Sequence, residues 1–206
     1  MLERTGIVLT AGVVQKERFG RTIKEPDKEG KVRCLGALDD FVNGEIKSIV
    51  VSGGLLLYGE PTSKPYVDYL RRQARRYKFN PEGIKRIPGR SNTSTDLKRA
   101  VKILGHRQMG NSDIYTSGYH LERAIPRLAT LRVRANGRRT EEITRNRTHR
   151  HGPIVDKIMK EVEERTKKHE AIGRIFVRVD QLPVIGWFHI GLRLEEVLVK
   201  IRKKGE

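Results

Sequence analysis

Short apolar runs alternate along the chain with longer segments in which apolar residues recur every three or four positions. Runs rich in β-branched residues predict buried strands at 6–10, 46–51, 84–87 and 113–116. Helical spacing between and after them predicts helices at 32–43, 62–77, 93–105 and 119–128. Strands that alternate with helices in this way form a parallel sheet covered by helices on both faces.

The remaining segments carry weaker patterns. Residues 13–30 are mostly polar and predict a long loop. Leu131, Val133 and Ala135 alternate with arginines, which predicts a fifth strand with one exposed side, followed by a basic loop at about 136–152. The last third predicts a helix near 154–162, a late strand near 175–179 and a terminal helix over 192–201.

Together these elements predict a Rossmann-like α/β fold, a parallel sheet with helices on both faces in a three-layer αβα sandwich. A length of 206 residues suits one globular domain with a sizeable core. No internal repeat or low-complexity linker divides the chain. We therefore expect residues 1–206 to form a single α/β domain.

Charge changes this picture more than any other feature of the composition. The chain has 43 Lys and Arg against 25 Asp and Glu, a formal net charge of +18, and such a field attracts nucleic acid, anionic membrane surfaces or phosphorylated metabolites. A proteome that is basic throughout is an alternative explanation, and it stays open. Cys34 is the only cysteine, and no window approaches the roughly 20 apolar residues of a membrane span. We expect a cytoplasmic protein without an internal disulfide or a membrane span.

Candidate chemistry gathers in the turns that follow the predicted strands. Right-handed crossovers bring these turns to one edge of the sheet, where open α/β folds bind ligands. Glycines let the backbone approach an anion, and amides at a helix start can donate to it. Ordinary turn and cap chemistry is the alternative for any one turn, but four such turns share this edge. The predicted ligand-binding residues are Gly12, Ser52, Gly53, Gly54, Asn92, Thr93, Ser117, Tyr119, His120 and Arg123.

Two of these turns also carry helix-start signals. Thr93 and Asp96 have the spacing of a capping box, and Ser117 can cap the next helix. His120 and Arg123 lie three apart in that helix, so both can face one space. Arg123 would bind phosphate or carboxylate, and His120 is the candidate catalytic residue, as a general acid or base. The alternative, in which both side chains contact neighbouring loops and acids, remains open.

The string from Tyr115 to Ala124, YTSGYHLERA, resembles the TSxYHxxRA signature of the YdcF/SanA/ElyC-like family, a domain of unknown function. The residues IVVSGG at 49–54 are similar to the family's second strand and glycine turn. Asn92-Thr93 with Asp96 resembles its NTxEN helix start, residues 8–12 resemble its first strand, and Arg33 stands where the family often places a helical arginine. The resemblance covers about residues 5–135 and leaves the C-terminal segment 153–206 divergent.

The resemblance implies a Rossmann-like fold and, from some members, binding of S-adenosylmethionine. Other members act in envelope and lipid-carrier metabolism behind a membrane anchor. The chain departs from the family at two acidic positions, near Pro88-Gly89 and at Thr95, which makes the predicted edge more cationic. These departures weaken any mechanism that uses a carboxylate there as a base or metal ligand. Acids available for ribose hydroxyls are Asp39, Asp40 and Glu60.

An arginine-rich stretch supports a second hypothesis. Arg138, Arg139, Arg145 and Arg147 lie close together and predict an exposed, mobile surface that binds nucleic acid in a salt-dependent way. The stretch has no aromatic residue for base stacking, and two histidines at 149 and 151 are a poor metal site. No metal site is predicted.

The sequence therefore favours a YdcF-like protein or enzyme that binds a nucleotide-like or phosphorylated small molecule at the carboxyl ends of the strands. S-adenosylmethionine is one candidate ligand. An enzyme at this site would be a transferase or a phosphate-ester hydrolase. The alternative is a nucleic-acid-binding module that uses the arginine-rich surface.

Overall fold

Five strands form one sheet in the order β7-β4-β1-β8-β9 in the computed structural model, which describes residues 2–88, 93–146, 157–158, 160–161 and 164. Every neighbouring pair of strands is parallel. The four strands predicted from β-branched runs are confirmed, with small differences at their ends. The strands are β1 (Thr5–Leu9), β4 (Ser48–Gly53), β7 (Ile84–Pro88), β8 (Ser112–Thr116) and β9 (Asn136–Arg139).

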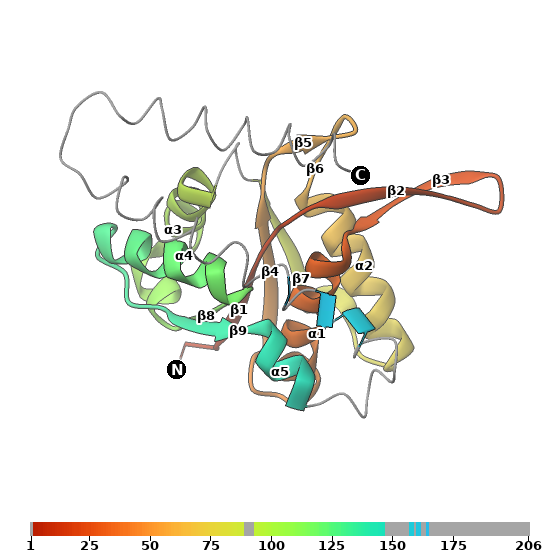
Figure 1. Ribbon diagram of the computed structural model, residues 1–206. Coiled ribbons are helices and arrows are strands. Elements are labelled where there is room, and N and C mark those ends of the chain that lie inside the picture. The colour runs from red at the N-terminus through yellow and green to blue at the C-terminus, as the bar shows by residue number, and fades with distance from the viewer. Residues whose placement is uncertain (1, 89–92, 147–156, 159, 162–163, 165–206) are drawn as a thin grey trace, which may run out of the picture.

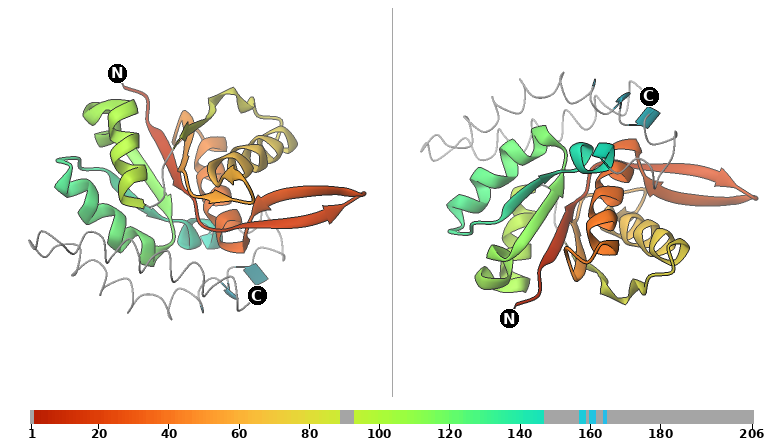
Figure 2. Two further views of the ribbon diagram at one scale, coloured as in Figure 1. Left: turned by 90° about the horizontal axis from the view of Figure 1, so that it is seen from above. Right: turned by 90° about the horizontal axis from the view of Figure 1, so that it is seen from below.

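Helices cover both faces of this sheet, which gives the predicted three-layer αβα sandwich (Figures 1 and 2). One face carries α1 (Lys28–Val42) and α2 (Ser63–Arg76), and the other carries α3 (Thr93–Gly110) and α4 (Gly118–Thr130). A short α5 (Thr140–Asn146) packs on α1, and a 3₁₀ turn, η1 (Pro81–Gly83), precedes β7. Of the helices that the structure describes, none combines the length and the apolarity needed to cross a membrane.

The central strand β1 contributes to two hydrophobic cores. Ile7 and Leu9 pack with Leu97 on the side of α3 and α4, whereas Val8 packs with Leu38 on the side of α1 and α2. All five residues of β1 are buried. Burial on both faces explains why the strand is a continuous apolar run instead of an alternating one.

Two hairpins lie in the connections between strands and helices, and the sequence predicted neither of them. β2 (Val13–Arg18) pairs with β3 (Arg21–Pro26), and β5 (Leu56–Leu57) pairs with β6 (Glu60–Pro61). The β2–β3 hairpin projects away from the layers in every view (Figures 1 and 2). The prediction of a loop over 13–30 is therefore wrong. Residues 15–22 are all exposed, so the hairpin lacks the apolar alternation that marks a half-buried strand.

Residues 131–146 also differ from their prediction. The fifth strand lies at 136–139 and not at 131–135, and α5 follows it directly, so 136–146 is not a loop. Arg132 has a φ of 57° and turns the chain out of α4, after which Val133 packs into the core below α4. The strand itself, Asn-Gly-Arg-Arg, is polar because it lies at the sheet's edge.

The C-terminal predictions fall mostly outside the described residues. Parts of the helix expected at 154–162 are described as helical, and Ile158 packs against Val32 and Leu35 of α1. The strand expected at 175–179 and the helix expected at 192–201 lie outside the described residues.

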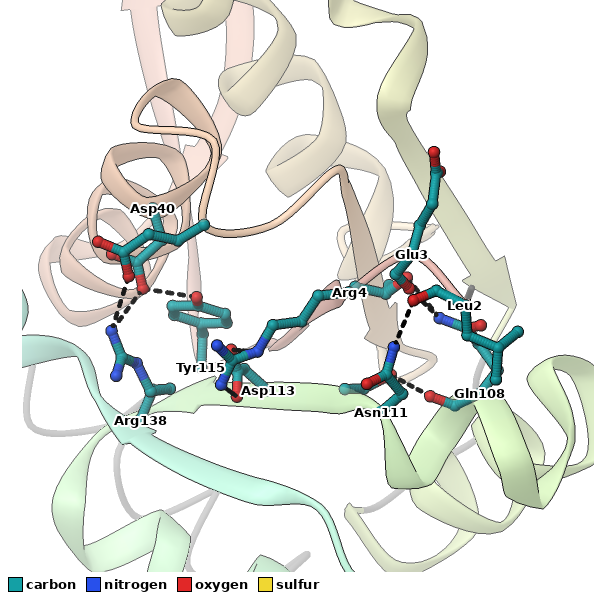
Figure 3. Close-up of polar contacts among 12 residues, drawn as sticks. Leu2, Glu3, Arg4, Asp40, Gln108, Asn111, Asp113, Tyr115 and Arg138 are labelled. Carbon is teal, nitrogen blue, oxygen red and sulfur yellow. Dashed lines mark hydrogen bonds and ion pairs between the residues drawn. The ribbon is translucent and has the colours of Figure 1, made fainter.

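Side chains of α3 and β8 hold the segment before β1 at the amino edge of the sheet (Figure 3). The Arg4 guanidinium pairs with the buried Asp113 carboxylate at 2.9 Å. Gln108 and Asn111 donate hydrogen bonds to main-chain carbonyls of residues 2–3, at 2.8 and 3.0 Å. These contacts fix where β1 begins and leave its opposite end for the site.

Candidate functional site

The carboxyl ends of all five strands lie at one edge of the sheet, because the strands are parallel. Ser52, one residue before the end of β4, and Thr116, the last residue of β8, therefore share the edge that the sequence predicted for them. The chain's winding reverses between β1 and β8, since the strands before and after this point are added on opposite sides of β1. We call the region at the carboxyl ends of β1 and β8 the switch point.

A buried polar network lies at the switch point, formed by Glu29, Arg33, Ser117, Tyr119 and the Leu9 carbonyl. We call it the carboxyl-edge network. The Arg33 guanidinium donates to the Leu9 carbonyl at 2.9 Å and to the Ser117 hydroxyl at 3.1 Å, and it forms an ion pair with Glu29. The Ser117 and Tyr119 hydroxyls both donate to the Glu29 carboxylate. The network ties the end of β1 to the start of α4.

The local sequence of α1 sets up this network. Asp27 caps α1 by accepting from the Gly30 amide at 2.7 Å, so the helix begins early enough to include Glu29. Glu29 and Arg33 are four residues apart and face the sheet together. Burial lowers the pKa of Arg33, but the Glu29 carboxylate and the nearby Tyr119 and Tyr66 hydroxyls together raise it by more, so the net pKa lies above its ordinary value. Arg33 therefore keeps its charge although it is 0% exposed.

Two predicted ligand contacts, Ser117 and Tyr119, are used inside the protein. Ser117 precedes α4 as expected, but its side chain makes no capping hydrogen bond and turns instead to Glu29. The capping prediction for Ser117 is therefore wrong. The Gly118 amide, at the first turn of α4, donates to the Glu141 carboxylate at 2.7 Å. An acidic side chain of α5 thus already occupies part of the positive end of α4.

The turn after β1 is held by the start of α2. The Ala11 amide donates to the Tyr66 hydroxyl at 2.7 Å, and that hydroxyl donates to the Gly12 carbonyl at 3.3 Å. Burial raises the pKa of Tyr66 well above its ordinary value, so this hydroxyl keeps its proton. The Thr10 and Thr62 hydroxyls lie 3.0 Å apart. These bonds fix the course of the backbone as it leaves β1.

Side chains of the same chain leave no room for a Cβ at Gly12 or Gly53. A Cβ at Gly53 would lie 1.9 Å from the Thr10 hydroxyl oxygen, and a Cβ at Gly12 would lie 2.4 Å from an Asp27 carboxylate oxygen. Close approach by a side chain of the same chain is thus the reason for glycine at both positions, and the predicted approach to an anionic ligand stays a prediction. Ser52 is buried and donates to the Asp96 carbonyl at 3.4 Å.

The other predicted site residues that the structure describes lie on α4 and at the carboxyl ends of β4 and β7. His120 and Arg123 are half-buried in the first half of α4, and the His120 ring lies edge-on to Tyr119 with centroids 5.0 Å apart. Gly54 and Thr93 are also half-buried at the carboxyl edge. Asn92 lies outside the described residues, and α3 already includes Thr93. A shared cleft for His120 and Arg123 stays a prediction.

Two of the three acids proposed for a ribose lie away from the carboxyl edge. Asp39 and Asp40 are buried near the end of α1, and Asp40 accepts from the Tyr115 hydroxyl at 2.6 Å (Figure 3). Glu60 pairs with Lys24 and Lys64. Instead, two unpredicted carboxylates, Glu29 and Glu141, reach the carboxyl edge. The loss of the family's two acidic positions therefore does not leave the described carboxyl edge without carboxylates.

The arginine-rich stretch is only partly a free surface. Arg138 is half-buried and pairs with Asp40 at 2.9 Å and with Glu45 at 3.4 Å (Figure 3). Arg139 is exposed and pairs with Glu142 at 3.6 Å. The Arg145 side chain and the whole of Arg147 lie outside the described residues. Arg138 thus holds β9 to α1, which the prediction of an exposed, mobile stretch did not foresee.

Signals for the two unpredicted carboxylates were weak. Asp27, followed by Glu29 and Arg33 four residues apart, is a pattern typical of a helix start. The mostly polar residues around Asp27 predict a loop and obscure this pattern. Glu141 has no such signal, because α5 brings it to α4 only in the folded chain. Within the described ranges, no three His, Cys, Asp or Glu residues gather in a way that could hold a metal ion.

Comparisons with models of protein families, with curated protein sequences and with solved structures gave no match. The functional interpretation therefore rests on the geometry of the switch point and on the motif at 115–124.

Proposed function

We propose that this protein binds a small anionic ligand, nucleotide-like or phosphorylated, at the switch point between β1 and β8. The strand order carries this proposal. The connection after β1 leads to α1 on one face, and the connection after β8 leads to α4 on the other face. Loops that diverge in this way leave a crevice between them, and open α/β sheets bind their ligands there.

The motif at 115–124 supports the same position. It spans the end of β8 and the first half of α4, so the residues that resemble the YdcF/SanA/ElyC-like family fall at the switch point. We propose membership of that family on this basis. S-adenosylmethionine and phosphorylated lipid carriers are the ligand classes that this resemblance implies.

Buried hydroxyls at the carboxyl edge add to the support. Thr116 Oγ1, at the end of β8, and Ser63 Oγ, at the start of α2, are buried and have no hydrogen-bond partner among the described residues. Buried polar groups in proteins are nearly always paired. A polar ligand that reaches this edge would supply partners to groups that the described fold leaves unsatisfied.

A ligand screen by thermal shift tests the proposal. The panel holds S-adenosylmethionine, mono- and diphosphate nucleotides, inorganic phosphate and a polyprenyl phosphate analogue. A ligand present at 100 times its Kd adds about 2.7 kcal/mol to the free energy of unfolding, so a true ligand raises Tm in a concentration-dependent way. If no member of the panel raises Tm, the proposal is wrong for these ligand classes.

Substitutions on α4 then test the position of the site. Arg123→Ala should weaken the ligand found in the screen by about 1.5–3 kcal/mol, the range for a charge-assisted hydrogen bond. His120→Asn should weaken binding less, yet abolish turnover if His120 moves a proton. Isothermal titration calorimetry measures the affinity of each variant, and an assay of product formation measures turnover. The control is Arg99→Ala, which removes an exposed arginine of α3. Unchanged affinity in Arg123→Ala would move the site away from α4.

A further inference from the structure

Two hairpins of this protein end in the same unusual way, with an exposed aromatic residue followed by glycine. Phe19-Gly20 joins β2 to β3, and Tyr58-Gly59 joins β5 to β6. All four residues have positive φ, between 52° and 77°. Two-residue turns of this kind favour Asn or Asp before the glycine, because a bulky residue is strained at positive φ. Turn chemistry therefore does not explain the aromatic residues.

Packing does not explain them either. The Phe19 side chain is 94% exposed and that of Tyr58 is 49% exposed. Phe19 contacts the Arg18 guanidinium, which lies 5.8 Å from the ring centroid. Phe19 and Tyr58 each have a strained backbone and an aromatic side chain exposed to water. This combination points to a role in binding, since backbone strain persists at functional sites.

The charges around the rings are mainly positive. Lys16, Arg18 and Arg21 are exposed, and none of them forms an ion pair with a described residue. Glu17, the acid at the tip, accepts a hydrogen bond from Thr22 at 2.5 Å. The β2–β3 hairpin therefore presents basic side chains on both of its strands, next to the aromatic ring of Phe19 at its tip.

Lys24, toward the base of the β2–β3 hairpin, connects the two hairpins. Lys24 of β3 donates to the Tyr58 carbonyl at 2.7 Å and pairs with Glu60 of β6 at 3.4 Å. Both hairpins leave the carboxyl edge, one after β1 and the other after β4. We define the hairpin surface as Lys16, Arg18, Phe19, Arg21 and Tyr58.

We propose that the hairpin surface binds single-stranded nucleic acid, with bases stacked on Phe19 and Tyr58 and phosphates bound by Lys16, Arg18 and Arg21. Rings interleaved with basic side chains are the features that bind single strands without sequence preference, since every base offers a face for stacking. A net charge of +18 favours such a polyanion over a neutral partner. Insertion into a membrane would call for a larger contiguous apolar surface. This inference does not depend on the small-ligand site.

Binding of fluorescein-labelled single-stranded RNA and DNA of about 12 nucleotides, followed by anisotropy, tests the proposal. Phe19→Ala and Tyr58→Ala should each weaken binding about 5- to 150-fold, the range that follows from the loss of a stacked base. Phe19→Trp should keep the affinity, whereas Phe19→Leu should lose it, because leucine keeps apolar bulk but has no ring face. Ile103→Ala on α3, a residue 47% exposed, is the apolar control and should bind as the wild type does.

A salt series tests the basic residues. Replacing Arg18 and Arg21 with Ser should lower the slope of log K against log salt by about 1.4, at about 0.7 for each phosphate contact of a single strand. Arg99→Ser with Arg107→Ser removes the same charge from exposed positions of α3 and should change the slope less. Thermal melting checks that each variant folds, as its exposed position predicts.

Three outcomes would overturn the proposal. The wild-type protein could fail to bind either oligonucleotide. Phe19→Leu could bind as tightly as the wild type, which would show that no base stacks there. Binding could instead appear only to vesicles of phosphatidylcholine and phosphatidylserine and be lost in Phe19→Ala, which would identify a membrane surface as the partner. The small-ligand proposal would survive any of these results, because its site and its variants are different.

Discussion

The guanidinium of Arg33 joins three elements at the carboxyl edge, namely α1 through Glu29, β1 through the Leu9 carbonyl and the start of α4 through Ser117. Arg33 is 0% exposed and Glu29 is 1% exposed. Neither charge can be solvated if the other is removed. The pair therefore ties the start of α1 to the end of β1 and to the start of α4.

Arg33→Ala should lower the free energy of unfolding by about 3–5 kcal/mol, the cost of leaving a buried charge without its partner. Urea denaturation followed by circular dichroism measures this loss. The double variant Glu29→Gln with Arg33→Met should lose less, because no buried charge remains. Arg18→Ala, at an exposed position, is the control. An Arg33→Ala protein as stable as the wild type would show that the network does not hold the edge together.

The positions of single residues could be predicted from the sequence more often than their contact partners. The positions of Ser52 and Ser117 at the strand ends followed from apolar runs and local turn chemistry. Their partners did not, because Ser117 donates to a carboxylate 88 residues away. A hydroxyl at a helix start looks like a cap from its neighbours alone. Only the folded arrangement shows that a stronger acceptor is within reach.

At the scale of elements, α3 contains a break in its backbone. Gly105 has φ 79° and ψ 156°, a conformation open to almost no residue except glycine. A Cβ at this position would meet no atom within 4 Å, so backbone strain is the only obstacle to a side chain. The break separates the half of α3 at the carboxyl edge from the half that holds the N-terminal segment through Gln108.

Gly105→Ala should therefore lower the free energy of unfolding by about 1–3 kcal/mol, through strain alone. Thermal or urea denaturation measures the change. Gly110→Ala is a matched control in the same helix, because Gly110 does not have positive φ and its Cβ would lie 3.8 Å from the nearest atom. Equal stability of the two variants would contradict the strained conformation at Gly105.

The β2–β3 hairpin is anchored at its base by Glu25. Its carboxylate pairs with Lys31 of α1 and Arg72 of α2, both at 2.9 Å. Burial raises the pKa of Glu25, but the two cations lower it by more, so the net pKa lies below its ordinary value. A lowered pKa stabilises the folded state above the unfolded pKa, and this stabilisation is lost as pH falls through the folded pKa.

Glu25→Gln should thus be less stable than the wild type at pH 7, by about 1 kcal/mol or less for a half-exposed pair. The difference should shrink as pH falls below about 4.3, the unperturbed value for a glutamate. Urea midpoints at several pH values measure it. Glu17→Gln, at the exposed tip and without an ion pair among the described residues, should show no such trend. A constant difference across pH would rule out the anchoring ion pairs.

Elements differed in how far the sequence could predict them. The inner strands β1, β4 and β8 followed from their apolar runs, because helices bury both of their faces. The edge strand β7 followed from Ile84 and Ile87, which are buried although Lys85 and Arg86 between them are exposed. The β2–β3 hairpin and β9 could not be predicted in this way, since one is exposed along its tip and the other is a polar edge strand. The early start of α1 could not be predicted, because Gly30 in its first turn is a residue typical of loops. Glycine is needed there because a Cβ would clash with the Tyr66 hydroxyl.

At the scale of the whole molecule, repulsion among like charges opposes folding. The net charge is +18, and self-repulsion of this kind destabilises the compact state when salt is low. Tm should therefore rise by several degrees when NaCl increases from about 0.02 to about 0.5 M, where the Debye length falls well below about 10 Å. Differential scanning calorimetry measures the trend, with sucrose in place of salt as the control. A fall in Tm would mean that screened ion pairs matter more than the net charge.

The central position of β1 affects how this chain can fold as it is synthesised. β1 is the first strand to be made, yet it pairs with β4 and β8, whose first paired residues are Ser48 and Ser112. Parallel neighbours need long crossover connections, so these pairings are non-local and slow to form. A nascent chain that has not yet reached β8 exposes one edge of its most apolar strand to other chains. We therefore expect translation that stalls before residue 112 to produce a chain that depends on chaperones, whereas a completed β8 would cover the open edge of β1.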